Sequence, residues 1–159
     1  MRIFNKPLSE YLSFAKVFLA LTVIVGLARL GLSLAGVPNA TVKWLSITIV
    51  SIVAVVYYAI RVHTSGFGGY KQLLALIVIQ SVVAQAIAIV GIVIAIVTHR
   101  DNIFSAPEYS PTADGKTWLH AGMHLVFGVV VGSLLWWGAG SVIMWVTKKV
   151  TSTAAAENA

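Results

Sequence analysis

Three histidines that lie close together in the sequence are the residues best suited to carry chemistry in this 159-residue chain. His120 and His124 are four residues apart, so on a helix their imidazoles project from the same face. His99 precedes them across a polar segment. That segment carries three carboxylates: Asp101, Glu108 and Asp114. Imidazole and carboxylate ligands suit zinc or copper(II), so the pattern indicates a candidate metal site with the histidines as ligands and the carboxylates in support.

The same histidines fit two other hypotheses. A b-type haem held between His99 and His124 would join two predicted helix ends and would indicate electron transfer. Haem-binding histidines of membrane cytochromes usually lie deeper, however, and no second pair exists for an electron relay. The alternative is a structural pair at the membrane interface, hydrogen bonded to the carboxylates of the polar segment. HxxxH pairs arise often by chance, so the spacing alone does not select among the three hypotheses.

Other kinds of chemistry find no support in the sequence. There is no G-x-S-x-G motif, no P-loop and no pair of intramembrane carboxylates, so we assign no catalytic residue and expect no catalytic activity of the chain's own. The absence of cysteine excludes a disulfide framework and a thiolate metal site. The formal charge of +6 comes from basic residues at predicted helix ends, not from a basic stripe with aromatics, so we expect no nucleic-acid partner.

The composition places the chain in a lipid bilayer. Hydrophobic residues make up 58% of it and charged residues only 10%, whereas a soluble domain carries roughly a quarter charged residues. A bilayer is crossed by about 20 apolar residues in a helix. Four stretches satisfy this length and predict transmembrane helices at about 17–35, 44–60, 73–98 and 118–146. The sequence therefore predicts an all-α integral membrane protein with a single membrane domain (1–159), folded as an up-down-up-down bundle of four helices.

Three segments lie outside the predicted spans. Residues 1–16 mix basic and apolar side chains and predict an interfacial N-terminal segment, residues 99–117 form an outer loop, and residues 150–159 are small and polar, which predicts a disordered tail. Basic residues set the orientation because they accumulate on the cytoplasmic side. The side that holds both termini has seven of them: Arg2, Lys6, Lys16, Arg61, Lys71, Lys148 and Lys149. The other side has three, so we expect both termini in the cytoplasm and a multi-pass location in the cell (inner) membrane.

The predicted third span carries the strongest packing pattern. Small residues recur there at alternating spacings of three and four: Ser81, Ala84, Ala88, Gly91, Ala95 and Thr98. Such a seam lets another helix backbone approach closely where lipid supplies no hydrophobic drive. Ile87 and Val90 lie off this seam and should tolerate a change of side chain. In the fourth span, Gly128 and Gly132 form a GxxxG pair with the same implication.

Three polar side chains interrupt the predicted spans. Arg29 lies near the end of the first span, and the favoured interpretation is that it reaches outward to the lipid headgroups. Gln80 and Gln85 would be costly in hydrocarbon, so we expect them to form hydrogen bonds between helices. If all three side chains met in one cavity, they would instead indicate a small transporter or channel.

Taken together, the seam and the glycine pair favour a small structural or accessory subunit. Its partners would be the lipid bilayer and other membrane protein subunits or a second copy of the chain. The first alternative is a metal- or haem-binding membrane protein, and the second is a small transporter or channel.

Overall fold

The computed structural model describes residues 1–109 and 114–157. In these residues, four helices are long and apolar enough to cross a membrane: Leu8–Leu34, Asn39–Thr64, Tyr70–Thr98 and Trp118–Thr153. This confirms the prediction of a mostly helical chain with four candidate membrane spans. The elements in chain order are β1 (Arg2–Ile3), β2 (Lys6–Pro7), α1 (Leu8–Leu34), α2 (Asn39–Val42), α3 (Ile47–Thr64), α4 (Tyr70–Thr98), the 3₁₀ turn η1 (Pro107–Tyr109), α5 (Trp118–Met123), the π-helix η2 (His124–Val131) and α6 (Gly132–Glu157).

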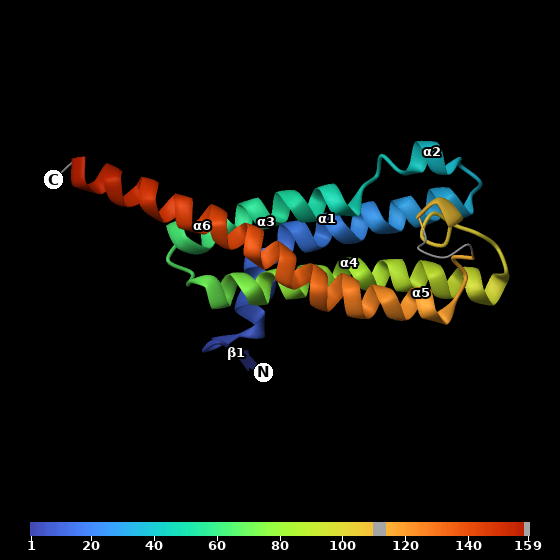
Figure 1. Cartoon of the computed structure of the whole chain (residues 1–159), viewed down its shortest axis with the longest axis horizontal. Coiled ribbons are helices and arrows are strands. Elements are labelled where there is room, and N and C mark those ends of the chain that lie inside the picture. Colours follow the sequence, from blue (N-terminus) through green and yellow to red (C-terminus); the bar gives the residue numbers. More distant parts are fainter. Residues whose placement is uncertain (110–113, 158–159) are drawn as a thin grey trace.

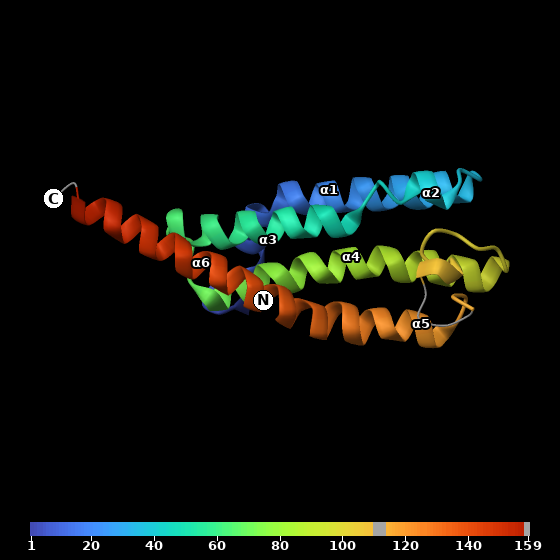
Figure 2. The same cartoon turned by 45° about the horizontal axis from the view of Figure 1, so that its top comes forward.

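The long helices form an elongated bundle in which each runs opposite to the one before it (Figure 1). Both termini therefore lie toward one end of the bundle, which we call the terminal end. Helix α2 and residues 99–109 lie at the opposite end, which we call the loop end. Figure 2 shows α6 leaving the side of α4 and continuing past α3 toward the C-terminus, and α6 contacts both of those helices.

The N-terminal segment, which the sequence predicts as interfacial over residues 1–16, contains a short hairpin and the start of the first long helix. Strands β1 and β2 pair as an antiparallel hairpin, and α1 begins directly after Pro7, well before the predicted start of the span. The hairpin is tied to the bundle by two hydrogen bonds, from the Tyr11 hydroxyl to the Ile3 carbonyl at 3.0 Å and from Gln72 Nε2 to the Phe4 carbonyl at 3.1 Å. If the first residues formed a helix of their own, these two carbonyls would instead accept hydrogen bonds from N–H groups within that helix.

The segment 150–159, which the sequence predicts as a disordered tail, is mostly a continuation of the last helix. Helix α6 continues to Glu157, and residues 158–159 lie outside the described residues. The hydroxyls of Thr151 and Thr153 donate hydrogen bonds to carbonyls one turn earlier, those of Thr147 and Lys149. Extending an existing helix costs far less than nucleating one, and alanine is the best helix former, so a small-residue tail after a long helix stays helical.

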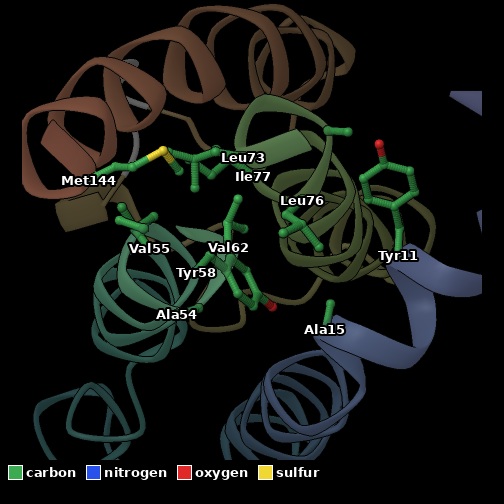
Figure 3. Close-up of a cluster of buried hydrophobic side chains, with 12 residues drawn as sticks. Tyr11, Ala15, Ala54, Val55, Tyr58, Val62, Leu73, Leu76, Ile77 and Met144 are labelled. Atoms are coloured by element: carbon green, nitrogen blue, oxygen red, sulfur yellow. The ribbon is translucent and has the colours of Figure 1, made fainter. Parts of the chain in front are cut away.

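Large side chains from all four long helices fill the terminal end (Figure 3). Tyr11 of α1, Tyr58 of α3, Leu76 of α4 and Met144 of α6 are completely buried there. Figure 3 shows Met144 beside Leu73 of α4, at the meeting of the last two long helices. Interiors of this kind are packed as densely as organic crystals, so this end of the bundle acts as a solid anchor for the rest.

A buried hydrogen-bond relay closes this core toward the middle of the bundle. The Tyr58 hydroxyl donates to Gln80 Oε1 at 3.1 Å, and Gln80 Nε2 donates to Thr22 Oγ1 at 2.5 Å. The relay joins α3, α4 and α1, and all three side chains are buried. A buried amide that is bonded at both its oxygen and its nitrogen escapes the cost of an unsatisfied polar group.

Candidate functional site

The loop end contains a cavity of about 250 Å³ between the helices. All four candidate spans contribute to its wall, together with residues just after α4. The lining side chains are Arg29, Ile47, Thr48, Ala84, Gln85, Ala88, Ile103, Phe104 and His124. The wall thus combines one cation and three neutral or titratable polar groups with five apolar side chains.

Small residues on α4 create the space for this cavity. Ala84 and Ala88 are buried and line it. One turn further on, a Cβ atom on Gly91 would lie 2.6 Å from Cδ2 of Phe104, which is too close for any side chain. The close approach that the small-residue seam predicted is therefore made within the chain, by a segment that follows α4. Ile87, which the sequence analysis placed off the seam, is also buried. Its side chain packs against Gly26 of α1.

That segment, residues 102–106, folds into the bundle and forms the roof of the cavity. All five of its residues are buried, although the sequence predicted a polar outer loop over 99–117. The Asn102 side chain satisfies the buried backbone: Nδ2 donates to the Gly91 carbonyl at 2.7 Å, and Oδ1 accepts from the Phe104 N–H at 2.9 Å. Because these bonds replace water, the apolar side chains of Ile103 and Phe104 can enter the interior.

Polar contacts fasten the roof to α1, and the 3₁₀ turn η1 that follows it to α2. Ser33 Oγ accepts a hydrogen bond from the Ile103 N–H at 2.8 Å, and Asn39 Nδ2 donates to Glu108 Oε1 at 3.1 Å. Both distances are those of ordinary hydrogen bonds. The roof is thus held from outside the segment as well as by Asn102.

The carboxylates expected to support a metal have other partners. Lys116 Nζ lies 2.7 Å from Asp101 Oδ1 and 3.5 Å from Asp114 Oδ1. The backbone N–H of Lys116 donates to Asp114, and this bond is the main reason that the pKa of Asp114 is lowered. The hydrogen bond to Asp101 is in turn the main reason that the pKa of Lys116 is raised. Glu108 is hydrogen bonded to Asn39. The three carboxylates therefore contact a lysine or an asparagine side chain at the loop end.

Two of the three candidate histidines come together. The rings of His120 and His124 are tilted, with centroids 5.0 Å apart. His120 is buried, and its Nδ1 donates to the Gly115 carbonyl at 2.8 Å. Thr117 caps the helix that carries it. His99 lies at the end of α4 in a left-handed conformation and is exposed.

These positions do not assemble a metal centre in the part of the chain that the structure describes, where no three histidine or acidic side chains stand close enough to share an ion. A haem between His99 and His124 would in addition need space that a cavity of about 250 Å³ does not supply. The metal and haem hypotheses therefore stay predictions, and the geometry of the histidines lends them no support.

His124 instead belongs to the cavity. Its Nδ1 lies 2.6 Å from Gln85 Oε1, so the imidazole N–H donates to the amide oxygen and leaves the Gln85 amide nitrogen as a donor. His124 also begins the π-helix η2. In η2, Gly128 packs against the Gln85 side chain so closely that a Cβ atom would collide with it. For Gly132, the other glycine of the GxxxG pair, a Cβ atom would approach only the Phe127 carbonyl of the same candidate span.

The sequence contains no feature that we could have read as a π-helix. Such segments often occur at functional sites because they shift side chains out of the regular helical register. Here the shift occurs at the point where His124 and Gly128 meet Gln85. The glycine pair, interpreted from sequence as a helix-packing signal, contributes Gly128 to a contact between η2 and α4 within the chain.

Arg29 points into the cavity. It lines the wall, its guanidinium carbon is 5.3 Å from the centroid of the Phe104 ring, and its Nε atom is buried. The contact of Arg29 with lipid headgroups that the sequence favoured stays a prediction. Gln80 lies apart from it in the relay described above. Of the three intramembrane polar residues, two therefore meet in one cavity, where they are joined by His124.

A smaller cavity of about 90 Å³ continues the site toward the middle of the bundle. It shares Thr48 and Gln85 with the first and adds two hydroxyl groups, those of Ser51 and Ser81, beside Trp136. The sequence indicated Ser81 only as a small residue of the packing seam, and Ser51 received no role because a serine in a span can bond to its own helix. Their gathering at Gln85 is a property of the packed helices.

No protein-family model, curated protein or solved structure matches this chain. The class of protein therefore follows from the four apolar helices alone, which are those of a multi-pass membrane protein.

Proposed function

We propose that this protein binds a small polar ligand in the loop-end cavity. The observation that carries the proposal is the convergence of Arg29 from α1, Gln85 from α4 and His124 from η2 on one cavity within the candidate spans. Ionisable and amide side chains are expensive at membrane depth, and they are usually found there where they serve a substrate or an ion. The cavity, of about 250 Å³, is close to the low end of small-molecule sites, which span about 300–1,000 Å³.

The packing of the two ends supports binding over an open channel. The terminal end is filled by Tyr11, Tyr58, Leu76 and Met144, and the Gln80 relay lies between that core and the cavity. A ligand in the cavity thus meets a solid floor. The protein would serve as a binding or sensing component, and transport would require a rearrangement of the terminal core.

The accessory-subunit hypothesis loses its main argument in this arrangement. Ala84, Ala88 and Gly91 are buried within the chain's own bundle, so the seam no longer indicates a second protein. Association with other membrane subunits or with a second copy stays a prediction, which co-purification in mild detergent would test.

We also propose that the protein lies in the cell membrane with both termini in the cytoplasm and the cavity near the outer face. The support is the excess of basic residues on the side of the termini. The chain has no cysteine, so single cysteines report topology directly. In intact cells, a membrane-impermeant maleimide should label Thr41→Cys, exposed in α2, and spare Ser65→Cys, exposed after α3. Labelling of Ser65→Cys alone would reverse the orientation.

The cavity itself is tested by filling it. We expect a screen of small charged and neutral compounds to contain some that raise the Tm of the purified chain. Ala88→Leu places a larger side chain in the cavity and should abolish the shift. Ala86→Leu is the matched control, because it makes the same change two residues away on an exposed face of α4.

Two outcomes would contradict the proposal. One is a screen in which no compound of any charge changes the Tm. The other is a set of shifts that Ala88→Leu and Ala86→Leu both retain, since the compounds would then bind elsewhere. Loss of the shift in Ala88→Leu alone is the expected result.

A further inference from the structure

We propose that the smaller cavity holds a cluster of bound water molecules, and that this water enters through the larger, loop-end cavity. The two cavities together would form a water-filled inlet that ends in the middle of the bundle. The inference goes beyond the proposed function, because it stands whether or not a ligand enters the larger cavity. Three observations carry it: hydroxyl groups without a partner, a lining without charge, and the wall that the two cavities share.

The hydroxyl groups around the smaller cavity lack the bond that such groups make elsewhere in this chain. Serine and threonine in a helix can donate to a carbonyl of the preceding turn. Thr98 and Thr147 do so, each to the carbonyl four residues earlier. Within the described residues, the three hydroxyls that line the smaller cavity make no hydrogen bond: those of Thr48, Ser51 and Ser81. Polar groups inside a span need a partner, and these three can find one in the cavity.

Ser133 of α6 adds a fourth hydroxyl of the same kind. It is only 2% exposed, and its Oγ atom has no hydrogen-bond partner within the described residues. It lies three residues before Trp136, which lines the cavity, so the two side chains share a face of α6. Buried polar atoms without a protein partner are commonly bonded to ordered water. This face of α6 therefore also calls for water.

The lining of the smaller cavity suits water better than an ion or a large solute. No ionisable side chain belongs to it among the described residues, and a charge at membrane depth is costly without an opposite charge beside it. Hydroxyl groups both donate and accept hydrogen bonds, as water does. The cavity of about 90 Å³ has room for a few water molecules, each of which takes about 30 Å³ in the liquid.

The two cavities adjoin one another, so water in one is continuous with water in the other. They share these wall residues: Ile47, Thr48, Ala84 and Gln85. Toward the terminal end, Gln80 is buried and bonded to both Tyr58 and Thr22, and the packed core follows. Water can therefore enter from the larger cavity and stops at this relay. Ser81 lies near the middle of α4 (Tyr70–Thr98), so the inlet brings water into the middle of the span.

The experiment uses single cysteines, because the chain has none of its own. A thiol reacts as the thiolate, which forms in water and not in hydrocarbon. Ser81→Cys and Ser51→Cys place a thiol at the cavity with little change in volume. Val82→Cys is the matched control, since Val82 is next to Ser81 but 47% exposed on the outside of the bundle. The full-length variants, in phosphatidylcholine nanodiscs, are treated with silver ion, and the remaining thiol is labelled with a maleimide after unfolding.

We expect silver, a small ion confined to water, to consume the thiol of both serine variants at least tenfold faster than that of Val82→Cys. Adding Ala88→Leu to Ser81→Cys should slow the reaction at least tenfold, because leucine fills the larger cavity through which the ion passes. Adding Ala86→Leu, on the exposed face of α4, should leave the rate unchanged.

The unsubstituted chain gives a second measurement, which decides the question if the cysteine variants fail to fold. Solid-state NMR in bilayers should show fast transfer of magnetisation from water to the methyl group of Thr48. Transfer to the methyl group of Thr22, which is completely buried in the relay, should be slow. Equally slow transfer to both threonines would overturn the bound water.

The remaining results are equally decisive. Ser81→Cys reacting no faster than Val82→Cys would show a dry cavity and overturn the inference. A fast reaction retained when Ala88→Leu is added would overturn the route through the larger cavity. A ligand screen without any hit, beside a fast reaction of Ser81→Cys, would remove the proposed function and leave this inference standing.

Discussion

The two ends of the bundle are built from the same four spans but are filled in opposite ways. At the terminal end, Tyr58, Leu76 and Met144 belong to one cluster of large side chains and are fully buried. At the loop end, α4 presents Ala84 and Ala88 instead, and the space they leave holds a roof segment and a cavity. Large side chains at one end make it rigid, so small side chains at the other can form a cavity without loss of the fold.

Two glutamines on α4 show the same contrast at the scale of single residues. Gln80 is buried and is bonded at both its oxygen and its nitrogen, to Tyr58 and Thr22. Gln85, five residues later, is half-buried, accepts from His124 and lines the cavity. The same residue type therefore joins three helices in one half and lines a cavity in the other.

The largest effect should come from the terminal core. Leu76→Ala should lower the free energy of unfolding by about 2–5 kcal/mol, because it removes buried methyl groups and leaves a cavity that the core cannot close. Leu135→Ala, at a side chain that is 70% exposed, is the control and should change it by less than about 0.5 kcal/mol. Denaturant unfolding in detergent measures both. Equal losses would mean that the two ends are not differently packed.

Asn102→Ala should have the next largest effect, a loss of about 1–3 kcal/mol, because the buried Gly91 carbonyl and Phe104 N–H would lose their partner. Thermal unfolding measures the loss. The change should also loosen the roof, so that amide hydrogen exchange of residues 102–106 rises while that of α3 stays slow. Asn39→Ala removes a less buried bond at the same end and should have a smaller effect. An unchanged exchange rate would show that Asn102 does not hold the roof.

The two glutamines should differ by a smaller amount. Gln80→Leu should lower the free energy of unfolding by about 1–2 kcal/mol, since the Tyr58 and Thr22 hydroxyls would lose their partner inside the core. Gln85→Leu should cost less than this, because it faces a cavity, yet it should weaken ligand binding. Measuring unfolding and binding for both variants sets the stability role against the binding role. A larger stability loss for Gln85→Leu would contradict the division of the molecule that we describe.

The smallest effect should be the pH dependence of stability that comes from Asp114 and Lys116 at the loop end. The pKa of Asp114 is lowered in the folded chain, so its contribution to stability is present above the ordinary pKa of about 3.9 and is lost as the pH falls below it. The pKa of Lys116 is raised, so its contribution is present below the ordinary pKa of about 10.4 and is lost as the pH rises above the folded value. Asp114 is exposed and Lys116 is partly exposed, so both limbs should be shallow.

Two variants separate the loss of stability at low pH (the acid limb) from the loss at high pH (the alkaline limb) when Tm is measured as a function of pH. Asp114→Asn should reduce the acid limb, measured as the difference from wild type, and leave most of the alkaline limb. Lys116→Gln should remove the alkaline limb but keep part of the acid limb, because the backbone N–H of residue 116 still donates to Asp114. An acid limb of full size in Asp114→Asn would show that another carboxylate is responsible.

Much of the fold was predictable because hydropathy is a local property. Each span is long and apolar by itself, so four candidate helices could be located from the sequence, although their ends shifted by several residues. The tail after Lys149 shows the limit of local reasoning. Its composition is typical of disorder, but it continues α6 as far as Glu157 because it follows a helix that is already formed.

The candidate site was predictable in its members and not in its arrangement. Arg29, Gln85 and His124 stand out by type because polar groups are costly in hydrocarbon. Their meeting could not be read from spacing, since they come from three helices and their distances depend on how those helices pack. His124 lies beside His120, as their spacing predicts, but the metal and haem hypotheses placed it with His99, whereas it is bonded to Gln85 because η2 faces α4 at that level.

The sequence by itself determined that this chain has four helices able to cross a membrane, which residues there are polar, and which are small, because each property depends on a side chain and its near neighbours. Only the tertiary structure decided that residues 102–106 turn inward, that the π-helix begins at His124, and that the small residues of α4 border a cavity. Those outcomes depend on the fit between segments far apart in the chain, where one buried side chain such as Phe104 can enter only because another position, Gly91, has none.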